Sequence, residues 1–127
     1  MLIYLDQSIC NTLVYNLTLF SKLKLRMPKL YEYFGLIILF YSNAHEPIHV
    51  HGKYQGRECK AEIIFENGEF REIRLSNVKG KLPLDSKNEK RFKAVVEYYR
   101  DDIVSKWISF FVFNKEVQSE VITKKID

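Results

Sequence analysis

Hydrophobic residues follow a two-residue period through the middle of the chain and a three-to-four-residue period near its end. Residues 36–41 are apolar on both parities, which is typical of a strand covered on both faces. Residues 48–65 alternate between apolar and polar positions around Gln55-Gly56, a pair that favours a tight hairpin turn. Asn67-Gly68 marks a second turn and leads into a short strand over residues 70–75. These segments predict an antiparallel β-meander.

An amphipathic helix is predicted after the sheet. Ser86 and Glu89 have the spacing of a capping box, and Pro83 precedes them. The apolar stripe that follows contains Phe92, Val95, Val96, Tyr99, Ile103, Trp107 and Phe110. Its spacing predicts a helix of about 20 residues or more. This is longer than the average helix, so a kink or break near Asp101-Asp102 is an alternative.

The predicted fold class is α+β, with a small antiparallel meander of three to five strands and one face under a long C-terminal helix. Residues 117–126 are a candidate terminal strand. Over residues 13–25, leucine and tyrosine occupy alternate positions, which is the period of a strand. Residues 1–26 therefore form an N-terminal extension, either an extra strand or a segment upstream of a true start at Met27. The single domain proper spans residues 27–127.

Composition limits the function classes further. The chain has 127 residues, 46% of them hydrophobic, which is enough for one domain with a core. Lys and Arg exceed Asp and Glu by 20 to 16, a net charge of +4 that permits nucleic-acid contact without requiring it. Cys10 and Cys59 lie far apart in sequence, which excludes a disulfide framework and a Cys-based zinc knuckle. We expect a reducing, cytoplasmic location.

Several common classes lack support in this sequence. The first residues show no signal-peptide pattern, and the longest uncharged run, residues 7–20, is too short and too polar to span a membrane. Phosphate-binding loops and dinucleotide fingerprints are absent, so no nucleotide cofactor is expected. Cys59 falls on the apolar parity of its strand, which favours a core position over a nucleophile.

All three histidines of the chain lie between residues 45 and 51. Because strand side chains alternate, His49, His51 and Lys53 share one face. A two-residue turn at Gln55-Gly56 then places His51 opposite Lys60 and His49 opposite Glu62. The predicted helix covers the other face, so the histidines should project together from the polar one.

The third strand is harder to align. A three-residue loop at residues 66–68 with a glycine bulge sets Glu72 beside Glu62 and Arg74 beside Lys60. Like charges side by side are unfavourable. Either the register differs, or a protonated His49 or a bound cation compensates.

The polar face supplies the candidate site. The candidate catalytic residues are His49 and His51. The candidate binding residues are His45, Lys53, Lys60, Glu62, Glu72 and Arg74. The competing interpretation is that this face is a solvated surface on which the histidines are ordinary polar strand residues.

A divalent metal at His49 and His51 is one functional hypothesis. A His-x-His strand aims two imidazoles about 6.5–7 Å apart at the Cβ level to the same side. Glu62 or His45 would complete three ligands with an open position, which suits zinc or a non-haem metal.

Phosphodiester chemistry is the other hypothesis for this face. His49 and His51 would exchange protons while the neighbouring cations hold a phosphate, without a metal. The same cations with Tyr54 would also suit plain RNA binding. The face's glutamates would repel a phosphate unless they are paired.

Several residue groups resemble a known family pattern. They are Met27-Pro28-Lys29-Leu30, Phe34-Gly35, His45, Pro47, His49-Val50-His51, Gly80-Lys81-Leu82-Pro83 and Trp107. Over residues 27–127 the chain resembles a prokaryotic family called domain of unknown function 4160. That pattern usually has a second proline in place of Ile48 and often an aromatic residue in place of Val50. Members typically begin near the equivalent of Met27.

The resemblance implies a small intracellular bacterial protein with no assigned activity. Family genes often adjoin another small family, which implies a toxin–antitoxin-like pair. Our leading hypothesis is a cytosolic binding module that contacts RNA or a protein partner through the histidine-bearing face. The alternative is an enzyme on that face, a metal-dependent hydrolase or a metal-free ribonuclease. A third hypothesis is that residues 110–113 dock a partner protein.

Overall fold

The computed structural model describes residues 28–41 and 47–127. The expected strand over residues 13–25 and the candidate residue His45 lie outside the described residues.

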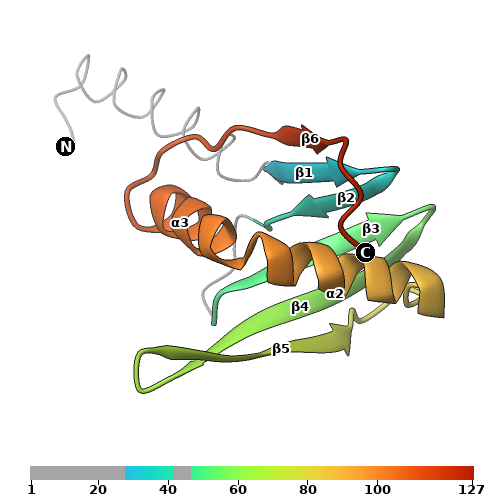
Figure 1. The fold of residues 1–127 in the computed structure, drawn as a ribbon, viewed down its shortest axis with the longest axis horizontal. Coiled ribbons are helices and arrows are strands. Elements are labelled where there is room, and N and C mark those ends of the chain that lie inside the picture. Colours follow the sequence, from blue (N-terminus) through green and yellow to red (C-terminus); the bar gives the residue numbers. More distant parts are fainter. Residues whose placement is uncertain (1–27, 42–46) are drawn as a thin grey trace, which may run out of the picture.

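Six strands of the described residues form one sheet in the order β5-β4-β3-β2-β1-β6 (Figure 1). The strands are β1 (Lys29–Tyr33), β2 (Leu36–Leu39), β3 (His49–Tyr54), β4 (Arg57–Glu66), β5 (Glu69–Asn77) and β6 (Glu120–Ile122). All neighbouring pairs are antiparallel except β1 and β6, which run parallel. The α+β class is confirmed, but the predicted count of three to five strands was too low. The strand β1 was not among the predicted ones.

Two helices replace the single long helix that was predicted. Helix α2 spans Ser86–Tyr98 and α3 spans Arg100–Phe111. The break falls at Tyr99, two residues before the expected position, where φ is −100° and ψ is 18°. The Tyr99 ring packs against Tyr31 of β1 with ring centres 4.8 Å apart. The spacing of apolar residues did not mark Tyr99 as the break, because the apolar stripe continues through this residue.

The cap of α2 also differs from the predicted one. Asp85 is the N-cap, and its Oδ1 accepts a hydrogen bond of 2.8 Å from the backbone N–H of Asn88. Ser86 is the first helical residue instead. Asp and Ser are both favourable N-cap residues, so the sequence alone did not decide between these two neighbours.

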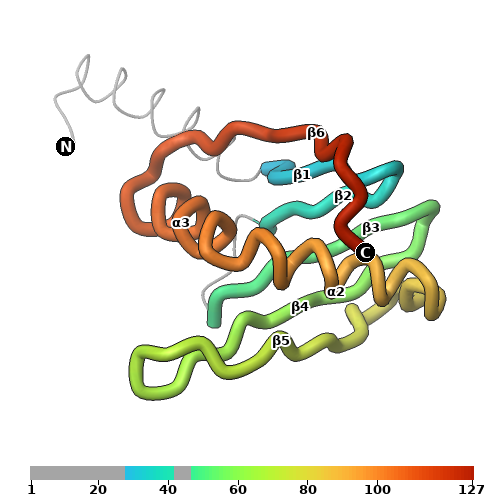
Figure 2. The backbone as a smooth tube through the Cα atoms, in the orientation of Figure 1, coloured from blue at the N-terminus to red at the C-terminus, as the bar shows by residue number. Residues whose placement is uncertain are grey.

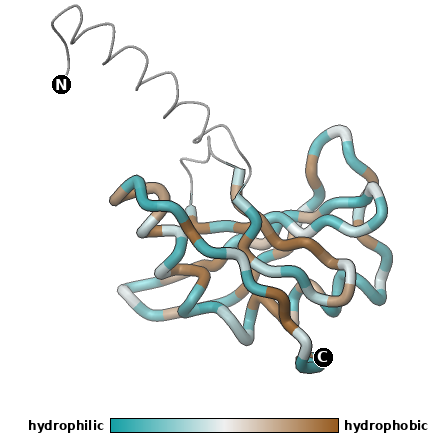
Figure 3. Tube along the Cα trace, turned by 90° about the horizontal axis from the view of Figure 1, so that it is seen from above, coloured by the Kyte–Doolittle hydropathy of each residue, from teal (hydrophilic) through white to brown (hydrophobic). Residues whose placement is uncertain are grey.

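Both helices lie across the same face of the sheet (Figures 1 and 2). The main core forms there from Val50, Cys59, Ala61, Ile63 and Ile73 of the sheet and Phe92, Val95, Val96 and Ile103 of the helices. The chain trace alternates between hydrophobic and hydrophilic residues (Figure 3), as expected of amphipathic elements. Gly52 lies directly beneath Phe92, and a Cβ there would be 2.6 Å from the ring.

The β3–β4 register is the predicted one, with His49 opposite Glu62 and His51 opposite Lys60. The predicted β4–β5 register was wrong by two residues. Ile73 faces Ile63 and Arg74 faces Glu62. The cause is a two-residue turn at Asn67-Gly68, with both residues at positive φ, followed by an irregularity in the ladder. Opposite charges therefore face each other, and no compensating cation is needed here.

Candidate functional site

The face of the sheet away from the helices carries the candidate residues. Strand alternation puts these side chains on the side opposite Val50 and Cys59. We call this surface the histidine face; it consists of Tyr41, His49, His51, Lys53, Glu58, Lys60, Glu62, Glu72 and Arg74. Most of the predicted site residues are thus brought to one side of three neighbouring strands.

The histidine face is not a solvated surface at its centre. His49 and His51 are each 8% exposed, and Glu58 is 1% exposed. Lys53, Lys60 and Glu62 are half-buried around them, whereas Glu72 and Arg74 on β5 are exposed. Buried polar side chains of this kind require hydrogen-bonding partners. The interpretation of the histidines as ordinary solvent-facing strand residues therefore fails for His49 and His51.

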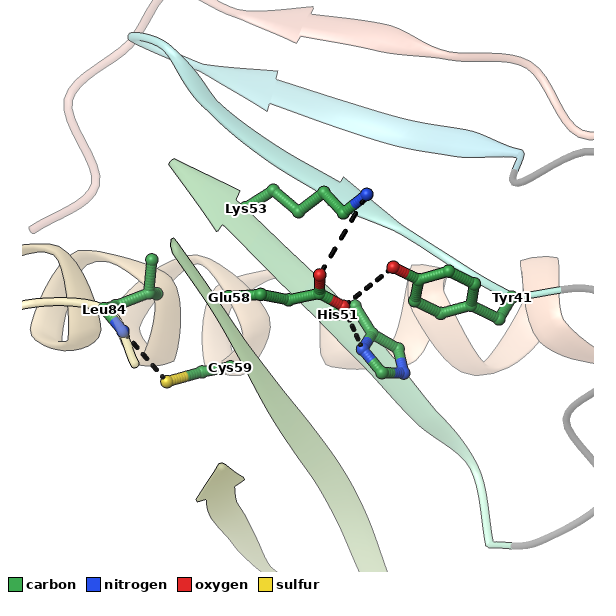
Figure 4. A network of polar contacts seen from close by, with 6 residues as sticks. All are labelled: Tyr41, His51, Lys53, Glu58, Cys59 and Leu84. Carbon is green, nitrogen blue, oxygen red and sulfur yellow. Dashed lines mark hydrogen bonds and ion pairs between the residues drawn. The ribbon is translucent and has the colours of Figure 1, made fainter. Parts of the chain in front are cut away.

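Glu58 is the centre of a buried hydrogen-bond network (Figure 4). Its Oε2 accepts hydrogen bonds from His51 Nδ1 at 2.9 Å and from the Tyr41 hydroxyl at 2.8 Å. Lys53 Nζ lies 4.0 Å from Oε1, an oxygen that accepts no hydrogen bond from any described residue. The Tyr41 and His51 rings meet edge to face with centres 4.3 Å apart.

Glu58 and Tyr41 were not among the predicted site residues. Glu58 had a usable signal, because the two-residue turn at Gln55-Gly56 sets it opposite Lys53, on the same face of the hairpin as His51. Its near-complete burial had no such signal. Tyr41 lies two residues beyond the end of β2, and the pairing of β2 with β3 brings this stretch of chain beside His51.

The network fixes the charge states of its members. Burial is the main cause that lowers the pKa of His51 to about 4, against the opposing effect of the Glu58 carboxylate. Burial and the hydrogen bond to Glu58 raise the pKa of Tyr41 to about 12. At pH 7 the His51 imidazole and the Tyr41 phenol are therefore both neutral.

His49 is held in a similar way by the backbone. Its Nδ1 donates a hydrogen bond of 2.8 Å to the carbonyl oxygen of Pro47. The His49 and His51 rings lie 5.4 Å apart between centres, with an angle of 67° between their planes. Both Nδ1 atoms are thus engaged in hydrogen bonds to oxygen acceptors.

The cations of the histidine face each have a carboxylate partner. The ion pairs are Lys53–Glu58 at 4.0 Å, Lys60–Glu62 at 3.8 Å and Arg74–Glu72 at 2.8 Å. Glu62 faces His49 across the β3–β4 ladder, but its ion-pair partner is Lys60. Within residues 28–41 and 47–127, no group of three His, Cys, Asp or Glu side chains is arranged to hold a metal ion.

The secondary candidates are placed elsewhere. Cys59 lies in the core, where burial raises the pKa of its thiol and Sγ accepts a hydrogen bond from the Leu84 N–H at 3.4 Å. In residues 110–113, Phe110 is a core residue while Val112 and Phe113 are more than half exposed. Trp107 packs against Phe111 with ring centres 4.8 Å apart. That segment is therefore part core and part surface.

Comparison of the sequence with models of known protein families identifies one family. Residues 35–108 match the family described as Domain of unknown function (DUF4160). The matched region runs from the turn before β2 into α3 and includes the histidine strand; it is narrower than the expected 27–127. No curated protein and no solved structure shows significant similarity. Neither helix of the described residues has the length and apolar character that crossing a membrane requires. Because the match covers more than half of the sequence, the chain belongs to the DUF4160 family.

Proposed function

We propose that this domain binds a divalent transition-metal ion, zinc being the best fit, through the Nε2 atoms of His49 and His51. The observation that carries the proposal is the pair of anchored imidazoles. Metal-binding histidines almost always donate their other ring N–H to a carboxylate or a backbone carbonyl. Here His51 is joined to the Glu58 carboxylate and His49 to the Pro47 carbonyl.

The anchors determine which ring nitrogen is free. The Pro47 carbonyl oxygen only accepts hydrogen bonds, so Nδ1 of His49 carries the hydrogen of that bond. Nδ1 of the neutral His51 imidazole donates to the Glu58 carboxylate, which leaves the lone pair of His51 on Nε2. Figure 4 shows the second ring nitrogen of His51 directed away from Glu58 and toward the start of β3, where His49 lies. The low pKa of His51 means that protons compete weakly for this nitrogen at pH 7.

The ring spacing agrees with a shared ion. Two imidazoles that bind one tetrahedral ion at about 2.0–2.1 Å from each nitrogen have ring centres about 5 Å apart. The observed separation is 5.4 Å. A closed structural site needs two more ligands, and a catalytic site needs at least one more with water in an open position. Of the two sequence-based candidates for that third ligand, Glu62 is ion-paired with Lys60 and forms no metal-holding group with the two histidines. The proposal therefore assigns the third position to His45, which lies outside the described residues.

A metal-dependent hydrolase would be the enzymatic form of this proposal, with the open position holding an activated water. Phosphate chemistry without a metal has less support. A ribonuclease acid needs a protonated group near pH 7, and His51 is neutral there. RNA binding needs free cations, whereas Lys53, Lys60 and Arg74 are each paired with a carboxylate. The toxin–antitoxin role rests only on the family resemblance, and the protein partner rests on that resemblance and on the exposed part of residues 110–113.

Metal titration tests the proposal. Tag-free chain, stripped with a chelator, is titrated with Zn²⁺ by calorimetry and with Co²⁺ by absorption, because tetrahedral cobalt has a strong visible band. We expect stoichiometric binding that is lost in His49→Ala and in His51→Ala. Glu58→Gln keeps the side-chain shape but weakens the anchor of His51, so affinity should fall about 10–100-fold.

Lys93→Met on α2 is the matched control, since it removes an exposed positive charge without removing a ligand or the partner of one. Its metal affinity should stay within about twofold of the parent, because α2 covers the opposite face of the sheet (Figure 1). Circular dichroism and a thermal melt establish that each variant is folded. The proposal is overturned if the parent binds neither ion, or if folded His49→Ala and His51→Ala bind with unchanged affinity. Salt-sensitive RNA binding that falls in Lys60→Met, without metal uptake, would favour the RNA hypothesis instead.

A further inference from the structure

We propose that the outer edge of β5 is a docking edge for a second copy of this chain. The two β5 strands would pair antiparallel about a two-fold axis, with Ile73 facing its own copy. This inference is independent of the metal site, because it rests on the sheet edge rather than on the histidines.

The first observation is the length of the edge. β5 is the last strand of the sheet on its side (Figure 1), and within the described part of the chain no strand pairs with its outer side. Its nine residues span about 30 Å at the usual rise per residue. The opposite edge, β6, has only three residues. Long edges present backbone N–H and C=O groups that can pair with another chain.

The second observation is the charge pattern of the strand. Glu72 and Arg74 flank Ile73, and their side chains lie on the same face of the sheet. In the proposed register Glu72 faces Arg74 of the second copy, and Arg74 faces Glu72 of the second copy. Opposite charges directly across an antiparallel pair are favourable.

The same charges disfavour other alignments. A pairing centred on Glu72 or on Arg74 sets like charges opposite each other. A shift of the pairing by a single residue would place the helix-covered face of one copy on the same side as the histidine face of the other. Charged edges normally protect a protein against pairing with arbitrary strands. Here Glu72 and Arg74 leave one register favourable, and in that register β5 pairs with β5 of a second copy of this chain.

The side chains are available for the exchange. Glu72 and Arg74 are 49% and 57% exposed, and they form an ion pair with each other at 2.8 Å. Each would replace that pair with an equivalent one across the interface, so the charges set the register and contribute little net affinity. Backbone hydrogen bonds supply the attraction. The association should therefore be modest and dependent on concentration.

A charge-swap series tests the docking edge. Sedimentation velocity over a range of protein concentrations is run on the full chain and on three variants, with circular dichroism to establish folding. The parent should show a concentration-dependent dimer. Arg74→Glu sets two pairs of glutamates face to face and should weaken the dimer by at least tenfold in Kd. The double variant Glu72→Arg with Arg74→Glu restores opposite charges and should recover most of the association.

Lys93→Glu on the exposed side of α2 is the matched control for charge, and it should leave the dimer unchanged. A parent that stays monomeric at every concentration overturns the proposal. So does a dimer that Arg74→Glu weakens no more than Lys93→Glu does. If Arg74→Glu itself misfolds, the folded double variant still decides, since its failure to dimerise contradicts the proposed register. These readouts do not involve metal, so their failure leaves the metal proposal standing.

Discussion

The two faces of the β3–β4 hairpin are both buried, but by different means. On the helix face, Gly52 and Cys59 pack beneath α2 with apolar neighbours. On the histidine face, His51 and Glu58 are buried as a hydrogen-bonded pair, beside Tyr41. Apolar burial stabilises a fold directly, whereas buried polar networks often do no better than apolar residues of the same shape. The helix face therefore supplies stability, and the buried polar network of the histidine face is the feature on which the metal proposal rests.

The largest expected effect is on the helix face. Gly52→Ala places a Cβ within 3 Å of the Phe92 ring, and the ring cannot move without displacing α2. We expect a loss of about 3 kcal/mol in the free energy of unfolding, as for an overpacked core. Chemical denaturation measures it.

Adding Phe92→Leu to Gly52→Ala makes room, so the double variant should lose less than the sum of the two single variants. Simple additivity would contradict the close contact as the cause.

An intermediate effect is expected on the histidine face. Glu58→Ala leaves His51 Nδ1 and the Tyr41 hydroxyl buried without their acceptor, which should cost about 2 kcal/mol in the free energy of unfolding. Replacing the whole network, with Glu58→Leu, His51→Leu and Tyr41→Phe, should restore most of that loss, because no unpaired polar group remains.

The same triple variant should bind no metal. Recovered stability with lost metal binding would separate function from folding on this face. A triple variant less stable than Glu58→Ala would instead make the network a structural feature.

The smallest effect concerns Tyr31, which reaches from β1 to Asp102 of α3 on the helix face. Its hydroxyl donates a hydrogen bond to the Asp102 carboxylate, and burial raises its pKa well above the usual value. Tyr31→Phe should cost about 1 kcal/mol at pH 7, the usual net value of one hydrogen bond.

The sign of the pH effect follows from the raised pKa. Below pH 10 the folded and unfolded states both keep the Tyr31 proton. Above about pH 10 the unfolded chain loses it while the folded chain holds it, so the free energy of unfolding falls as pH rises. Tyr31→Phe should make that fall shallower in denaturation series at pH 9–11. An unchanged slope would contradict a buried, proton-retaining Tyr31.

Local patterns were sufficient for the hairpin and its neighbours. The Gln55-Gly56 turn and the two-residue alternation fixed the β3–β4 register, so the projection of His49 and His51 to one side followed from sequence. The predicted β4–β5 register was wrong because two shifts add up. The two-residue turn moves the alignment by one residue from the predicted three-residue loop, and the irregularity between Ile64 and Phe65 moves it by one more. A glycine after asparagine suits both turn lengths, so the sequence did not decide between them. The strand β1 and the break at Tyr99 depend on contacts with distant residues.

Hydrophobic period, turn chemistry and motif were enough to predict the α+β class, the family and the shared side of the two histidines. Three further properties became visible only in the folded chain: this side is buried, Glu58 lies between Tyr41 and His51, and both Nδ1 atoms are hydrogen-bonded. The burial and the hydrogen-bond partners of His51 depend on side chains from neighbouring strands of the sheet. The local pattern of one strand does not show which other strands lie beside it.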